Sequence, residues 1–149
     1  MKYTIIVLLA LFSFSQTSFA ANSSKDKNVK SEYKADSKED KLNILWTTSE
    51  KETAKNMIAM YAGASLKNKW WSEVNIILWG GSVKLIKEDA EMQEVVRNLI
   101  KSGVHVEACH ACAGKYDAVD ILKSLGADVK YMGKSLTEYI KNGENIITI

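Results

Sequence analysis

Short apolar runs alternate with longer segments of helical periodicity through most of this chain. Five runs have the length and composition of β-strands, and they span residues 42–46, 73–79, 105–109, 129–132 and 145–149. The segments between them repeat apolar side chains three and four positions apart. A strand–helix repeat of this kind brings successive strands into a parallel sheet with helices on both faces. The alternation therefore predicts a three-layer α/β/α domain with an open, mainly parallel five-stranded sheet, although it leaves the strand order undefined.

Residues that start and stop helices support this interpretation. Two pairs have the spacing of a capping box, in which a hydroxyl and a carboxylate satisfy the first free backbone N–H groups of a helix: Ser49 with Glu52, and Ser135 with Glu138. Three glycines follow predicted helices, at the position where a left-handed residue commonly ends a helix: Gly103, Gly126 and Gly143.

The first 20 residues have the pattern of a secretory signal peptide. Lys2 precedes an apolar stretch from Tyr3 to Phe14, and small residues stand two apart at Ser18 and Ala20. The apolar stretch is shorter than the roughly 20 residues that a membrane-spanning helix needs. We therefore expect cleavage near Ala20 and a periplasmic or otherwise exported protein without a stable membrane span.

Residues 21–41 are charged and rich in serine, with almost no large apolar side chains. Such a segment cannot bury enough surface to offset the entropy of ordering, so we expect a disordered charged tether followed by one domain at 42–149. Without Lys2, the 20 basic side chains fall to 19, against 18 acidic ones. This balance gives no electrostatic reason to expect a nucleic-acid partner.

Both cysteines of the chain lie where a parallel sheet gathers its chemistry. Ligands bind at the carboxyl ends of parallel strands, and four segments follow such ends: 47–49, 80–82, 109–112 and 133–135. Cys109 and Cys112 belong to the third segment. Backbone N–H groups at a helix start favour a thiolate over a thiol, and a protonated His110 would add to that effect. Cys109, Cys112 and His110 are therefore the candidate catalytic residues.

Metal and haem sites do not fit this segment. His105 and Cys109 are four residues apart on a predicted strand, roughly 13 Å, which is too far for one zinc ion. Covalent haem needs a histidine directly after the second cysteine, and Ala113 stands there. We expect neither a metal nor another cofactor within one chain.

Three interpretations of the cysteine pair remain open from the residues alone. A thioredoxin-type oxidoreductase is disfavoured, because that fold faces its cysteines with a cis-proline loop and this chain contains no proline. Dithiol redox chemistry on another fold, a structural disulfide and sulfur transfer all remain. A bridge across so short a loop would remove little entropy from the unfolded chain, which weighs against a purely structural disulfide.

The domain resembles the DsrE/DsrF-like family. The string "ACHACAGKYDAVDILKSLGADVKYMGKSLTEYIKNGENIITI" is similar to the carboxyl half of these proteins, and "LNILWTTSEKETAKNMIAMYAGASLKNKWWSEVNIILWGGSVKLI" to their first two strand–helix units. The resemblance implies a small parallel α/β domain that assembles into trimers or hexamers. It also implies a reactive cysteine, matching Cys109, that accepts sulfane sulfur as a persulfide and passes it along a relay.

Two departures from the family modify this expectation. The relay members work in the cytoplasm, whereas this chain carries an export signal. The family position that matches Cys112 need not be cysteine, and a thiolate there can attack a persulfide on Cys109, close a disulfide and expel sulfide. We therefore expect an exported protein that handles sulfane sulfur, with a sulfurtransferase-like or sulfur-carrier activity. The alternatives are a dithiol redox protein and a non-catalytic binding or assembly module.

Several aromatic and glycine residues have a structural and a functional interpretation. Trp46 and Trp79 each end a predicted strand, where they line the crevice or, more commonly, pack against a helix. The "WGGS" segment at 79–82 lacks the glycine pattern and the lysine of a phosphate-binding loop. Gly80 and Gly81 are therefore interpreted as turn residues.

We predict that the domain forms a homo-oligomer through its helical faces or through Trp70 and Trp71, since it carries large apolar side chains outside the obvious core positions. Light scattering on residues 42–149 measures this directly. A monomer at every accessible concentration would contradict the prediction.

Overall fold

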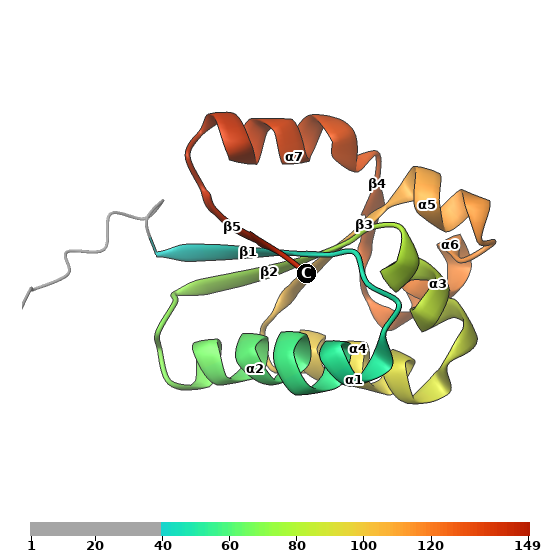
Figure 1. Cartoon of the computed structure of the whole chain (residues 1–149), viewed down its shortest axis with the longest axis horizontal. Coiled ribbons are helices and arrows are strands. Elements are labelled where there is room, and N and C mark those ends of the chain that lie inside the picture. Colours follow the sequence, from blue (N-terminus) through green and yellow to red (C-terminus); the bar gives the residue numbers. More distant parts are fainter. Residues whose placement is uncertain (1–39) are drawn as a thin grey trace, which may run out of the picture. The chain divides into compact units, whose positions relative to one another are not determined.

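The five strands form one all-parallel sheet in the order β4-β3-β2-β1-β5 (Figure 1). This arrangement comes from a computed structural model that describes residues 40–149. The strands are β1 (Lys41–Trp46), β2 (Glu73–Leu78), β3 (His105–Cys109), β4 (Asp128–Lys130) and β5 (Asn145–Thr148). The predicted signal peptide and nearly all of the predicted tether lie outside the described residues. The all-parallel sheet confirms the predicted α/β fold class.

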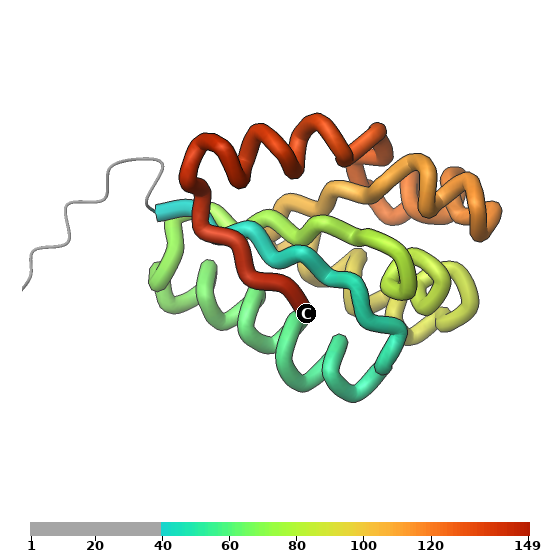
Figure 2. Tube along the Cα trace, turned by 45° about the horizontal axis from the view of Figure 1, so that its top comes forward, coloured from blue at the N-terminus to red at the C-terminus, as the bar shows by residue number. Residues whose placement is uncertain are grey.

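The helices follow the strands in alternation. They are α1 (Lys51–Thr53), η1 (Ala54–Ala59, a π-helical stretch), α2 (Met60–Lys67), α3 (Gly81–Glu88), α4 (Ala90–Lys101), α5 (His110–Lys115), α6 (Val119–Leu125) and α7 (Met132–Lys141). The tube view shows how the last strand, β5, returns to lie beside the first, β1 (Figure 2). β5 is therefore the strand at one edge of the sheet, next to β1.

The two faces of the sheet are packed very differently. On one face, most of the helices bury a large apolar core that includes Ile44, Ile58, Val96 and Leu122. On the other face α7 lies over the sheet (Figure 1), and the buried apolar cluster there consists of Ile77, Cys109 and Met132. The free energy of apolar burial is roughly proportional to area, so the first face supplies most of the stability.

Two element boundaries differ from the sequence prediction. The fourth strand ends at Lys130, and Met132 begins α7, so Gly133 and Ser135 lie inside a helix instead of a strand-end loop. Helix α3 was not predicted, because its eight residues are too few to display a clear period beside the longer α4.

Both predicted capping boxes are wrong. The first helix is capped by Glu50, whose carboxylate accepts hydrogen bonds from the N–H groups of Glu52 and Thr53. Ser135 lies within α7, which begins three residues earlier. In both cases the helix starts at a position that the capping pattern does not identify. The glycines at 103, 126 and 143 do take positive φ angles of 98°, 98° and 70°, as predicted.

The turn from β2 into α3 depends on two glycines with different roles. Gly80 has a φ of 64°, a conformation that residues with a side chain rarely adopt. Gly81 has an ordinary φ but lies against the loop after β1, where an added Cβ would be 2.8 Å from the carbonyl oxygen of Thr47. Gly80 is a turn residue, as interpreted from the sequence, whereas Gly81 is the first residue of α3. The N–H of Gly80 lies 3.3 Å from the sulfur of Cys112, in the first turn of the helix after the third strand.

We predict that Gly81→Ala lowers the free energy of unfolding by about 1–3 kcal/mol, because backbone must shift to admit the methyl group. Gly63→Ala is the matched control, since its Cβ would meet only Leu99 at 3.9 Å and alanine favours a helix interior by roughly 0.5–1 kcal/mol. Urea unfolding curves measure both. A Gly81→Ala variant as stable as the parent would refute the close-contact argument.

Candidate functional site

The cysteine pair lies at the junction of β3 and α5, as the sequence predicts. Cys109 is the last residue of β3 and the N-cap of α5, and Cys112 lies in the first turn of that helix. The two thiols differ in exposure. Cys109 is only 4% exposed and packs against Ile77 and Met132, whereas Cys112 is partly exposed. Cys109 thus lies beneath the start of α7, enclosed by apolar side chains instead of open to solvent at the strand end.

Cys112 receives a hydrogen bond from the neighbouring strand-end loop. The N–H of Gly80 donates to its sulfur at 3.3 Å, and the thiol of Cys109 lies within hydrogen-bonding reach. Burial raises the pKa of the Cys112 thiol above its usual value, the Gly80 N–H opposes that shift, and Cys109 adds to it. The net effect is a raised pKa, so at neutral pH Cys112 is predominantly a protonated thiol.

His110 has a different neighbour from the one that its sequence position suggests. Its ring contacts the ring of Tyr131, with ring centroids 4.7 Å apart and the two planes tilted by 38°. Tyr131 is the N-cap of α7, and its side chain is well exposed. His110 thus contacts the beginning of the helix that covers Cys109.

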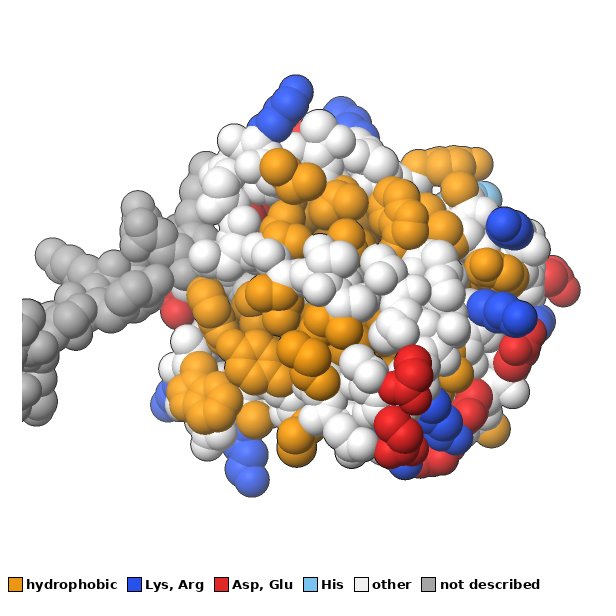
Figure 3. Space-filling model, in the orientation of Figure 1, with side chains coloured by type: hydrophobic (Ala, Val, Ile, Leu, Met, Phe, Trp, Pro, Cys, Tyr) orange, Lys and Arg blue, Asp and Glu red, His pale blue; other side chains and the backbone are white. Residues whose placement is uncertain are grey.

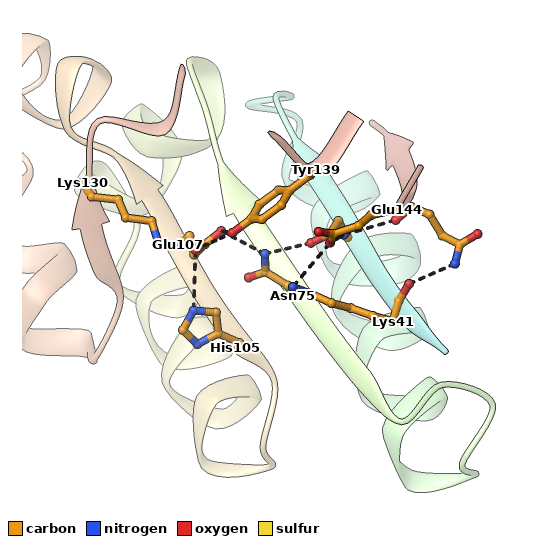
Figure 4. Close-up of polar contacts among 9 residues, drawn as sticks. Lys41, Asn75, His105, Glu107, Lys130, Tyr139 and Glu144 are labelled. Atoms are coloured by element: carbon orange, nitrogen blue, oxygen red, sulfur yellow. Dashed lines mark hydrogen bonds and ion pairs between the residues drawn. The ribbon is translucent and has the colours of Figure 1, made fainter. Parts of the chain in front are cut away.

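A buried carboxylate lies two residues before Cys109 on the same face of β3. Glu107 is 2% exposed, and Figure 4 shows side chains from four elements converging on it. Tyr139 of α7 places its hydroxyl 3.0 Å from each carboxylate oxygen. Lys130 of β4 donates to Oε1 at 2.5 Å, and the amide nitrogen of Asn75 donates to Oε2 at 2.9 Å. Glu107, on β3, therefore connects polar side chains of β2 and β4 to helix α7, which covers this face of the sheet.

The polar row continues across the sheet beneath α7. The amide of Asn75 also donates to Asn43 at 3.0 Å, and Asn43 in turn donates to Glu144 at 3.0 Å. Lys41 lies 3.5 Å from the same Glu144 carboxylate. We call this row of side chains, from Lys130 through Glu107, Asn75 and Asn43 to Glu144, the polar seam. Its presence explains why the apolar cluster on this face is so small.

The partners of Glu107 keep it ionised despite its burial. Burial alone raises a carboxyl pKa, but hydrogen bonds from Lys130, Asn75 and Tyr139 outweigh it, and the net pKa of Glu107 lies below 4.5. The same contacts act in the opposite direction on the partners. Burial and the Glu107 carboxylate raise the pKa of Tyr139 to about 12, and Glu107 raises the pKa of Lys130 as well. Tyr139 is therefore a hydrogen-bond donor throughout the physiological pH range.

His105, Glu107 and Asp128 bring one ligand atom each within 4.8 Å of one another. The ammonium group of Lys130 already lies beside both carboxylates, 2.5 Å from Glu107 and 2.9 Å from Asp128. The lysine supplies the positive charge that a metal ion would bring to these oxygens. The cluster is thus an ion-pair network.

Sequence reasoning missed Glu107, Lys130 and Tyr139. One signal was present: in "HVEAC" an acidic residue interrupts an otherwise buried strand. A buried charge requires partners, so an acidic residue at position 107 indicates a polar network around it. The partners come from β2, β4 and α7, and identifying them required the strand order.

A second concave surface lies away from the cysteines. A groove of about 530 Å³ runs between α2 and β5, lined by Met57, Met60, Tyr61 and Trp70. Trp70 is 58% exposed, while the indole N–H of Trp71 donates to Tyr61 at 3.3 Å. The space-filling view shows an extensive apolar patch on this face of the molecule (Figure 3). Trp46, in contrast, is fully buried in the main core.

Comparison with known proteins identifies the family. The profile described as the DsrE/DsrF-like family matches residues 40–149, which is the whole described domain. The chain belongs to the DsrE/DsrF-like family. The family is linked to sulfur relay in general, which agrees with the resemblance inferred from the sequence.

Two solved structures are similar to this chain. A conserved protein of unknown function from Bacteroides thetaiotaomicron, BT1422, is 49% identical, with a TM-score of 0.73 over 74% of this chain and 95% of that one. The ychN protein from E. coli has a TM-score of 0.56 at 12% identity, covering 74% of this chain and 99% of its own, and supports the fold alone. Among curated proteins no match was found. Within residues 40–149, none of the helices has the length and apolar character to cross a bilayer.

We predict that Glu107→Gln lowers the free energy of unfolding at neutral pH by about 2 kcal/mol, since hydrogen bonds to a charged group are lost. Glu138→Gln, on the exposed side of α7, is the control and should change stability by less than about 0.5 kcal/mol.

The loss of stability in Glu107→Gln should depend on pH in a defined direction. Because the folded pKa of Glu107 is below its ordinary value of 4.5, its stabilisation is complete above 4.5 and is lost as pH falls through the folded pKa. The difference between parent and Glu107→Gln, measured by urea unfolding across this range, should therefore shrink on acidification. A difference that is independent of pH would contradict the ionised state of Glu107.

Proposed function

We propose that this protein is an exported sulfur-handling member of the family, in which Cys109 accepts sulfane sulfur as a persulfide and Cys112 acts as the resolving thiol. The observation that carries the proposal is the pairing of two free thiols in unlike environments at the carboxyl edge of a DsrE/DsrF-like sheet. One thiol is enclosed by apolar side chains, and the other is more exposed and bonded to Gly80.

The loading step transfers one sulfur atom. The thiolate of Cys109 attacks the outer sulfur of a perthiol donor, R–S–SH. A new S–S bond forms on Cys109, the donor's S–S bond breaks, and the donor leaves as a thiol after taking up a proton. The apolar surroundings of Ile77 and Met132 exclude water from the resulting persulfide.

The resolving step would release that sulfur. The thiolate of Cys112 attacks the inner sulfur of the persulfide, forms a Cys109–Cys112 disulfide and expels hydrosulfide. Return to the starting state then requires a dithiol reductant from the same compartment. Because the pKa of Cys112 is raised, its thiolate is scarce at neutral pH. Resolution is consequently slow there, which favours a carried persulfide over immediate release.

A dithiol redox protein is the second candidate function. It is favoured by the same observation that makes Cys112 a resolving thiol, namely its position within hydrogen-bonding reach of Cys109. The two functions differ in what the pair accepts: a sulfur atom in the first and two electrons in the second.

Export and assembly complete the proposal. The small residues at Ser18 and Ala20 and the apolar stretch before them support secretion. The proposed reaction therefore belongs to an exported compartment, with a small perthiol or a protein as donor. The exposed Met60 and Trp70 support a homo-oligomer, with the groove beside β5 as the contacting surface.

We predict that Cys112→Ser accumulates a persulfide on Cys109 after incubation with a sulfane-sulfur donor, because the resolving thiol is gone. Cys109→Ser should gain little or no sulfur. Intact mass before and after reduction measures both. In the parent, hydrosulfide release should accelerate as pH rises toward the raised pKa of Cys112.

Other outcomes identify the other functions. Equal or absent loading of the two single variants would overturn the sulfur-carrier proposal. A pair that exchanges disulfides with a partner and never gains sulfur would indicate the dithiol redox function. Two variants that lose stability alike without selective uptake would indicate a structural disulfide.

A further inference from the structure

The thiol that accepts sulfur in the proposed function is covered in the folded protein. Cys109 is 4% exposed and lies in a cluster with Ile77 and Met132. Leu136 and Tyr139 of α7 pack on the same cluster. A reagent reaches the sulfur of Cys109 only after some part of this cover moves.

The cover, α7, has a small apolar anchor. Met132 is the one fully buried residue among its ten, and Ile140 is 63% exposed. Elements with few buried apolar contacts open locally at a fraction of the free energy of global unfolding. The large core lies on the other face of the sheet, so displacement of α7 leaves that core intact.

The underside of α7 rests on the polar seam. Glu107, Asn75 and Asn43 are polar and buried on this face of the sheet, whereas the opposite face carries the large apolar core. The oxygen of the Asn75 amide has no hydrogen-bond partner within residues 40–149, although the side chain is buried. Water that enters a polar seam replaces the lost hydrogen bonds, whereas separating two apolar surfaces gains nothing in return.

Tyr139 connects the seam to the cover. Helix side chains lean toward the amino end of their helix, so the ring of Tyr139 lies back along α7 against the Cys109 cluster while its hydroxyl meets Glu107. Lys41 lies over the same ring, 4.9 Å from its centroid. The ring of Tyr139 thus packs against the Cys109 cluster, while its hydroxyl is held by the buried carboxylate of Glu107.

We propose that Tyr139 and Glu107 form a latch that holds α7 over Cys109, and that opening of this latch sets the rate at which a small thiol-reactive molecule reaches the Cys109 sulfur. The latch concerns access to the thiol, and its meaning for sulfur loading rests on the proposed function. Tyr139 and Glu107 are positioning residues, since within residues 40–149 their side chains hydrogen-bond to each other and to the seam instead of to the thiol.

Tyr139→Phe is the informative variant because it removes the hydroxyl and keeps the ring. Lys130 and Asn75 still pair with Glu107 in this variant, and His105 remains 3.8 Å away, so the carboxylate stays compensated and the fold is retained. Thr137→Val is the matched control. It removes a hydroxyl from the same helix, but that hydroxyl donates to the carbonyl oxygen of Gly133 in α7 and, within residues 40–149, to no group of the sheet.

The experiment measures the alkylation rate of Cys109 by iodoacetamide in the full mature chain carrying Cys112→Ser. The rate is followed by intact mass at several urea concentrations below the unfolding transition. We expect Tyr139→Phe to react about tenfold faster than the parent, with a rate nearly independent of urea, since local opening exposes little surface. Glu107→Gln should act in the same direction, and the double variant should exceed the faster single variant only slightly, because both changes break one shared bond.

Three results would overturn the latch. They are a Tyr139→Phe rate equal to the parent's, an equal acceleration by Thr137→Val, and an acceleration whose urea dependence matches that of global unfolding. Alkylation involves no sulfane sulfur, so either the latch or the proposed function can be rejected without the other. Faster alkylation without any persulfide loading retains the latch and rejects the proposed function, whereas persulfide loading with unchanged alkylation does the reverse.

Discussion

The arrangement of the α7 face depends on one buried carboxylate. Glu107 lies on a central strand, and an unpaired charge there would cost several kcal/mol. Lys130, Asn75 and Tyr139 remove that penalty together, and each comes from a different element. Their convergence positions β4, β2 and α7 relative to β3. Since Cys109 follows Glu107 by two residues on the same face, this constraint also determines what covers the thiol.

The sequence predicted the fold better than its details, for physical reasons that individual elements show. Hydrophobic periodicity reports which residues face a core, and the five strands were therefore found near their observed positions. Strand order depends on contacts between segments far apart in the chain, such as β1 with β5, and no local pattern encodes them. The first capping prediction failed because Glu50, a residue type that seldom caps helices, accepts hydrogen bonds from the first backbone N–H groups of the helix.

For the candidate site, too, local sequence patterns predicted some features, while others depend on contacts between distant segments. The cysteines were located at the strand end from local spacing alone, and the structure has them there. Their relative exposure was not predictable, because Cys109 is buried by Met132, which lies 23 residues later in the chain. The hydrogen bond from Gly80 to Cys112 likewise joins two loops that meet only in the folded sheet. Glu107 was visible as an anomaly in a buried strand, but its partners were not.

Cys109 is buried beneath α7, and Cys112 beside it is a protonated thiol. In this environment the proposed persulfide on Cys109 would be held away from water. The most direct test is mass spectrometry of the protein purified from its own compartment without reductant, with fragmentation that separates Cys109 from Cys112. The account predicts molecules that carry one additional sulfur atom on Cys109, with Cys112 present as a thiol. Molecules in which Cys109 never carries additional sulfur and is found only in a disulfide with Cys112 would contradict it.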